Sequence, residues 1–180
     1  MTKCIEIKAR VNDLIKLNEI VESICHKKES FAQEDTYFRS PNGLLKLRIC
    51  SKGIPELIFY QRENIQGPKI SNYSRYKIDY SQPIYNFLTD LFGIRGFVRK
   101  KRTVFLVGQT RIHLDDVEGL GVFCELEVVM EPNQSDEYGI EISQKLMLHL
   151  GIQQDNLISK SYIDLFEQKN YISASVYQNS

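Results

Sequence analysis

The stretch from Thr110 to Met130, TRIHLDDVEGLGVFCELEVVM, decides the fold. After its glycines, Glu125 and Glu127 alternate with the apolar residues Leu126 and Val128. A period of two is typical of a β-strand with one charged and one apolar face. The residues before the glycines alternate in the same way, so the stretch predicts two strands joined by a turn. Their charged faces point either to water or into a cavity.

The same alternation recurs along most of the chain, between short turns that contain Gly, Pro or Asn-Gly. Helical spacing of apolar residues is confined to four segments. Eight antiparallel strands can close into a barrel that is wide enough for side chains or one small ligand. We therefore expect an α+β fold with a large antiparallel sheet, which can close into such a barrel with helices packed on the outside. The expected strands are 4–10, 31–39, 44–51, 56–62, 74–80, 96–107, 110–117 and 122–130, and the expected helices follow residue 13 and span 82–92, 135–150 and 159–166.

Composition sets the broad class. The chain has 180 residues, 42% hydrophobic and 26% charged, which indicates one globular domain over residues 1–168 and a loose tail over 169–180. Lysine plus arginine equals aspartate plus glutamate at 23 each, which argues against nucleic acid or a membrane surface as partner. Four scattered cysteines and the absence of a long apolar run predict a cytoplasmic protein with reduced thiols.

Charges of one sign are grouped by strand. Lys46 and Arg48 lie on one face of a strand. In the RKKR strand, either Lys100 and Arg102 or Arg99 and Lys101 form the inward-facing pair. A solvated face is the ordinary explanation for any single strand. Taken together, cationic strands beside a strand with paired carboxylates suggest a polyanion held with Mg²⁺ or Mn²⁺. No Walker A loop or GxGxxG motif occurs, so side chains would bind the phosphates.

Several motifs carry a family resemblance. They are the Glu6-x-Lys8 pair, LKLR, RENIQGPK, RKKR, the segment 109–130 and KSYIDL. In this order they resemble the CYTH superfamily, also called triphosphate tunnel metalloenzymes, and within it the class IV adenylyl cyclase branch. The resemblance implies a closed eight-stranded antiparallel β-barrel, a tunnel with a polar interior, that binds a small-molecule triphosphate with Mg²⁺ or Mn²⁺.

The resemblance also implies roles for individual residues. Carboxylates would hold metal, with Glu6, Glu125 and Glu127 as its ligands. The catalytic residues would be Glu6, Lys8, Asp115 and Glu127. His113 is in phase with Arg111 and Asp115, so it either enters the site or is a structural histidine. The phosphate-binding residues would be Lys8, Lys46, Arg48, Arg62, Lys69, Lys100, Arg102 and Arg111.

One position departs from the family pattern. The family motif Glu-x-Glu-x-Lys reads Cys4-x-Glu6-x-Lys8 here, and a thiol is a poor ligand for Mg²⁺. Three functions therefore stay open: cyclisation of ATP to cyclic AMP and pyrophosphate; hydrolysis of tripolyphosphate, thiamine triphosphate or a nucleotide; and binding without turnover. The sequence also leaves open whether the chain forms a homodimer.

Overall fold

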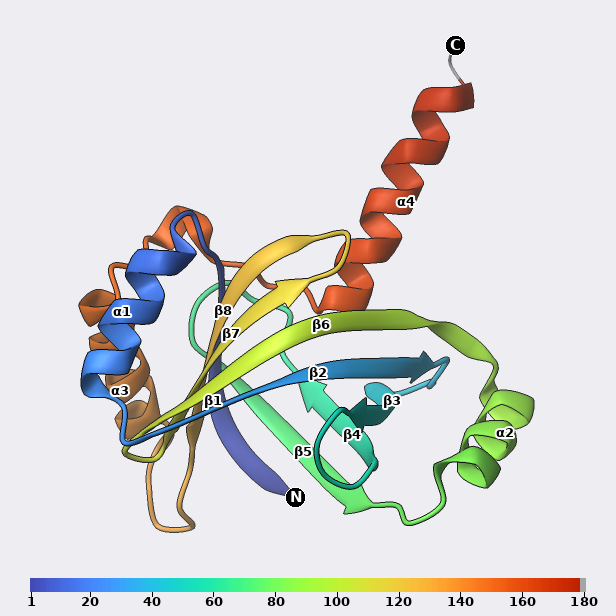
Figure 1. The fold of residues 1–180 in the computed structure, drawn as a ribbon, viewed down its shortest axis with the longest axis horizontal. Coiled ribbons are helices and arrows are strands. Elements are labelled where there is room, and N and C mark those ends of the chain that lie inside the picture. Colours follow the sequence, from blue (N-terminus) through green and yellow to red (C-terminus); the bar gives the residue numbers. More distant parts are fainter. Residues whose placement is uncertain (179–180) are drawn as a thin grey trace.

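The computed structural model describes residues 1–178, and the side chains of residues 1–170. Its eight strands pair antiparallel and close into one barrel in the order β1-β5-β4-β3-β2-β6-β7-β8. The predicted fold is therefore confirmed (Figure 1). The strands are β1 (Thr2–Arg10), β2 (Lys27–Phe38), β3 (Leu44–Cys50), β4 (Glu56–Arg62), β5 (Lys69–Lys77), β6 (Ile94–Val107), β7 (Thr110–Val117) and β8 (Gly121–Val129).

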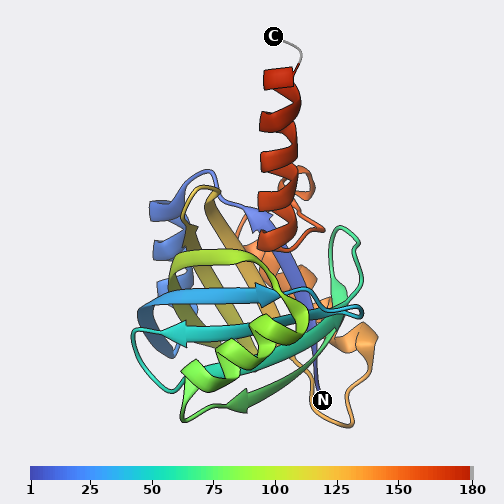
Figure 2. The same cartoon turned by 90° about the vertical axis from the view of Figure 1, so that its right-hand side faces the viewer.

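Four α-helices lie outside the barrel, as Figures 1 and 2 show. α1 (Leu14–Ile24) and α3 (Asp136–His149) lie on the same side of it, and α2 (Ser81–Phe92) lies against another part of the sheet. α4 (Tyr162–Gln178) starts at one end of the barrel and points away from it (Figure 1). Among the described residues, no helix is both long and apolar enough to span a bilayer.

The largest hydrophobic core lies between the barrel wall and helices α1 and α3. Val21 of α1 and the outward-facing Phe105 and Leu126 are completely buried there. Asp13 begins α1 by accepting a hydrogen bond from the Lys16 amide at 3.0 Å, as expected of an N-cap. Because the outer strand positions bury apolar side chains under helices, the alternate positions must face the interior.

Several element boundaries differ from the sequence prediction, and β2, for example, begins at Lys27 rather than at 31. β5 begins at Lys69 rather than at 74, because Lys69 pairs with Glu6 and the β1–β5 ladder closes the barrel. α1 ends at Ile24 rather than near 26–28, since Lys27 already pairs with Leu106 of the long strand β6. α4 continues past 166 to Gln178. The side chains after 170 lie outside the described part, so the loose tail stays a prediction, as does the boundary at 168.

Candidate functional site

Inward-facing side chains enclose a cavity of about 330 Å³ in the barrel. Among the described residues, eight lysines and arginines but only four carboxylates line it. One end, below the start of α4, is closed by buried apolar and aromatic side chains, including Val117, Phe123 and Tyr162. At the other end the half-exposed Phe31 and Val104 line the opening. The cavity is therefore a blind, positively charged tunnel.

The first group of cations is organised by Asp35 of β2. Lys46 donates to Asp35 Oδ2 at 2.8 Å, and Arg48 donates to both carboxylate oxygens at 2.8 and 3.0 Å. Gln33 donates to Oδ2 at 3.1 Å. Asp35 is 1% exposed, so its role is to hold the two cations, which line the cavity, in fixed positions.

A second group repeats this arrangement around Asp115 of β7. Lys100 donates to Asp115 Oδ2 at 2.9 Å, and Arg102 bridges both oxygens at 2.6 and 2.5 Å. The hydroxyl of Tyr162 also donates to Oδ2, at 2.9 Å. Asp115 is 0% exposed, so it holds Lys100 and Arg102 in position from inside the barrel, beneath the surface of the cavity. Of the two possible pairs in RKKR, Lys100 and Arg102 are thus the pair that faces the interior.

Burial changes the ionisation of both groups. Burial alone would raise the pKa of Asp35, but Arg48 and Lys46 outweigh it and hold that pKa well below its usual range. Asp115 behaves alike, with Arg102 and Lys100 lowering its pKa. Burial, assisted by Arg48, lowers the pKa of Lys46 to about 7 although Asp35 opposes the shift. A bound anion would therefore favour the protonated, positively charged form of Lys46.

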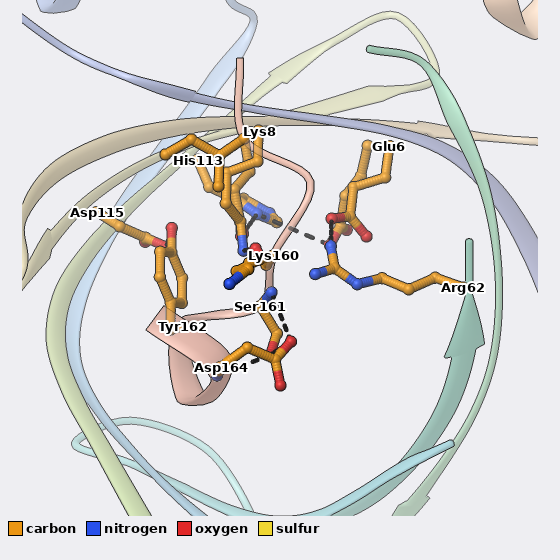
Figure 3. Close-up of polar contacts among 12 residues, drawn as sticks. Glu6, Lys8, Arg62, His113, Asp115, Lys160, Ser161, Tyr162 and Asp164 are labelled. Carbon is orange, nitrogen blue, oxygen red and sulfur yellow. Dashed lines mark hydrogen bonds and ion pairs between the residues drawn. The ribbon is translucent and has the colours of Figure 1, made fainter. Parts of the chain in front are cut away.

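Three further cations bind a backbone segment at the closed end, residues 157–161, which we call the strap. Lys69 donates to the Ile158 carbonyl at 3.2 Å and Arg62 to the Ser159 carbonyl at 3.1 Å. The Lys8 ammonium lies 3.4 Å from the Lys160 carbonyl, as well as 3.0 Å from Glu125 and 3.8 Å from the centre of the Tyr162 ring. Figure 3 shows Lys8 and Arg62 converging on this segment. The strap thus supplies oxygen acceptors to cations expected to bind phosphate.

The acidic strands supply a compact group of possible metal ligands. One ligand atom each from His113, Glu125 and Glu127 lies within 4.8 Å of the other two. These carboxylates keep a depressed pKa although burial opposes it: for Glu125 the nearby Lys8 and Arg102 outweigh burial, and for Glu127 the surrounding charged groups do so together. Because the ligand atoms are close together and the carboxylates ionised, the residues fit a divalent cation.

Glu6 and Cys4 lie beside this group on β1. Glu6 pairs with Glu127 across the β1–β8 ladder and accepts a bond from Arg62 at 2.5 Å. Cys4 is 2% exposed, and burial together with Glu127 and Glu6 raises the pKa of its thiol. Cys4 is therefore a neutral thiol in the cavity wall.

The open end of the tunnel carries the last predicted cation. Arg111 lies 3.5 Å from Glu127 and donates to the Tyr73 hydroxyl at 3.4 Å. Its side chain is 29% exposed, compared with 6% for Arg102 deeper inside. Arg111 therefore lies at the opening of the tunnel, close to the metal-ligand group.

The profile of the CYTH domain matches residues 3–162, nearly the whole described chain. The chain belongs to the CYTH domain family. A protein of Methanocaldococcus jannaschii named "putative adenylate cyclase" is 31% identical to this CYTH chain, over 89% of the chain and 97% of the relative. The predicted family is therefore confirmed, and the family generally binds triphosphates with a divalent metal.

Solved structures show the same fold. A Pyrococcus horikoshii protein superposes with a TM-score of 0.79 at 24% identity, covering 90% of this CYTH chain and 98% of its own. A Hippeastrum protein, described as a "putative adenylyl cyclase" with a dominant triphosphatase activity, has a TM-score of 0.62 at 17% identity, covering 94% and 96%. At these identities the likeness shows a shared fold and nothing more.

The structure gathers the predicted site residues around one tunnel, but not in equal positions. Asp115 and Lys69 face the interior of the barrel but are covered by other side chains, whereas the other predicted residues line the cavity. Sequence reasoning missed Asp35 and the strap. The signal for Asp35 was available, because it is in phase with Tyr37 on a strand that was recognised. The roles of all these residues in binding and catalysis stay predictions.

Proposed function

We propose that this CYTH chain binds ATP in the tunnel and converts it to cyclic AMP and pyrophosphate. One observation carries the proposal: among the described residues, eight lysines and arginines line the tunnel with only four carboxylates, and the cations remain in excess when the buried Asp35 and Asp115 are counted as well, which suits a polyanion such as a triphosphate. Such an anion has about four negative charges at neutral pH, and Lys and Arg neutralise phosphate oxygens by charge-assisted bonds. Binding at this position would exclude water and fix the phosphates.

The proposed reaction is an internal displacement at the α-phosphorus. The ribose 3′-oxygen forms a bond to that phosphorus, the bond to the bridging oxygen of the β-phosphate breaks, and pyrophosphate leaves. Lys100 and Arg102, held rigid by Asp115, would stabilise the charge that develops on the phosphates. Glu6, a cavity-lining carboxylate outside the metal-ligand group, would accept the proton of the 3′-hydroxyl.

Glu125 and Glu127 would hold the divalent ion. When bound, that ion neutralises phosphate oxygens and orients them. Lys8 contacts Glu125 at 3.0 Å, so it is placed to bind phosphate beside the carboxylates. The proposed division of roles is therefore cations on β1, β3, β4 and β6 for the phosphate chain and carboxylates on β8 for the metal.

The open end of the tunnel supports an organic triphosphate as substrate. Phe31, Cys50 and Val104 form an apolar part of the lining there, on strands β2, β3 and β6. An adenine ring that stays at the opening while the phosphates enter would contact this wall. Aromatic side chains bind bases by stacking, whatever the base.

Hydrolysis of a triphosphate is the second candidate. It is motivated by the Hippeastrum neighbour, whose description includes triphosphatase activity. The same cations would serve both reactions, because the two differ in whether a hydroxyl of the substrate or a water is in line with the phosphorus. Binding without turnover is the third, motivated by Cys4 in place of a carboxylate.

One experiment separates the three. The protein is incubated with ATP and with tripolyphosphate, each with Mg²⁺ or Mn²⁺, and the products are resolved by chromatography. Cyclic AMP with pyrophosphate supports the cyclase, orthophosphate without cyclic AMP supports the triphosphatase, and binding without product supports the binder. Arg102→Ala should abolish product formation, whereas Arg99→Ala, which removes a cation on the outer face of the same strand, should not.

A further inference from the structure

His113 has a buried nitrogen that the fold does not satisfy. The residue lies on β7, directly opposite Glu125 of β8, and is 4% exposed. Its Nδ1 atom has no hydrogen-bond partner among the described residues. A buried nitrogen is ordinarily paired, so its position calls for a partner that protein atoms do not supply.

Two carboxylate oxygens lie near this nitrogen. Nδ1 lies 3.5 Å from Glu125 Oε2 and 3.9 Å from Glu127 Oε1. These separations exceed those of good N–H···O bonds. Two ligands that share one ion at about 2.1 Å each are roughly 3.0–3.4 Å apart, so a small contraction around a cation would bring all three atoms to bonding distance.

Glu125 does not need a proton donor from His113. Its Oε1 atom is 3.0 Å from the Lys8 ammonium, and its Oε2 atom accepts from Arg102 at 2.5 Å. An imidazolium there would add a third cation to a carboxylate that already has two. A neutral imidazole with a free lone pair on Nδ1 is the form that binds metal.

We propose that His113 Nδ1 is a ligand of the metal held by Glu125 and Glu127, so that the site selects Mn²⁺-like transition ions over Mg²⁺. The proposal rests on the proposed metal site. Imidazole suits transition metals, whereas Mg²⁺ requires oxygen ligands. Cys4 stands where the family pattern has a further carboxylate. The group is thus poorer in oxygen and includes a nitrogen.

Electron spin echo spectroscopy of Mn²⁺ bound to the full chain tests this directly, because it detects nitrogen bonded to the metal. The wild type should show one coupled ¹⁴N, and His113→Ala should lose it. His149→Ala, which changes an exposed histidine on α3, should retain it. Calorimetric titration should show that His113→Ala lowers the ratio of Mn²⁺ to Mg²⁺ affinity by about 10-fold or more, the loss typical of disturbing a metal site.

An absence of Mn²⁺ binding, or bound Mn²⁺ without nitrogen coupling in the wild type, would overturn the proposal. Persistence of the coupling in His113→Ala would also do so. A parallel titration with tripolyphosphate distinguishes its failure from that of the proposed function. Triphosphate binding without nitrogen coupling would reject only the histidine ligand, whereas nitrogen coupling without triphosphate binding would reject only the triphosphate function.

Discussion

Raising the pH should weaken triphosphate binding through Lys46. In the free protein, burial lowers the pKa of Lys46 to about 7. A bound polyanion restores the charged form, so the complex holds more protons than the free protein above that pH. Affinity is then full below about pH 7 and falls as the pH rises. If the pKa of Lys46 in the complex exceeds about 9, linkage of one proton to binding lowers the triphosphate affinity roughly fivefold between pH 7 and pH 8.

The assay is calorimetric titration of tripolyphosphate without metal, at several pH values in buffers of different ionisation heat. Proton uptake on binding should be measurable near pH 8 in the wild type. Lys46→Arg is the matched variant, since arginine stays charged throughout this range, and it should lose most of the pH dependence between 7 and 8. Lys69, with a pKa that burial lowers to about 8, contributes at higher pH. The same pH slope in wild type and Lys46→Arg would refute the reasoning.

Folding stability should respond to pH with the opposite sign. In the unfolded chain Lys46 has an ordinary lysine pKa near 10.4, above its value of about 7 in the fold. The unfolded state therefore binds more protons between these values, and the contribution of Lys46 to stability rises with pH across that window. Urea unfolding of the free protein at pH 7 and pH 9, compared with Lys46→Met, measures this contribution. The expectation would be contradicted if the free energy of unfolding of the wild type fell, relative to that of Lys46→Met, between pH 7 and pH 9.

Other single changes test the wall of the tunnel. Asp35→Asn leaves two buried cations without a carboxylate and should lower the free energy of unfolding by about 3–5 kcal/mol in urea denaturation; a change below about 1 kcal/mol would contradict its role. Phe31→Ala should weaken ATP binding about 5- to 150-fold in calorimetry but leave tripolyphosphate binding unchanged. Phe97→Ala, at an exposed phenylalanine outside the cavity lining, is its control, and equal losses for both ligands would reject the stacking surface. Tyr162→Phe removes the hydroxyl bonded to Asp115 and should cost about 1 kcal/mol in thermal unfolding, whereas no loss would show that bond to be dispensable.

The alternation of charged and apolar residues was sufficient to predict the strands, and the family resemblance added their closure into a barrel. Alternation at Glu125 and Glu127 and at Lys100 and Arg102 depends only on local sequence, so the strands that carry these residues were predictable. The closing β1–β5 ladder was harder, because Lys69 follows a Gly-Pro loop and becomes a strand residue only through its pairing with Glu6.

The parts of the site that join distant segments could not be predicted. The strap reaches Arg62 from 97 positions away in the chain, through a backbone carbonyl that has no signature in the sequence. The alternation along β2 could have predicted an inward-facing Asp35, but its role as the partner of two cations follows only from the pairing of β2 with β3, which places it beside Lys46 and Arg48. The unpaired nitrogen of His113 likewise follows from the register of β7 and β8.

Two neighbouring lysines of β6 test the central claim most directly. Lys100 faces the cavity and is 6% exposed, whereas Lys101 is exposed on the outer face. Tripolyphosphate affinity, measured by calorimetry at low salt, should fall about 5- to 100-fold in Lys100→Ala, as expected for the loss of a charge-assisted bond, and stay within about twofold in Lys101→Ala. Equal effects of the two substitutions, or no binding by the wild type, would contradict a triphosphate site inside the barrel.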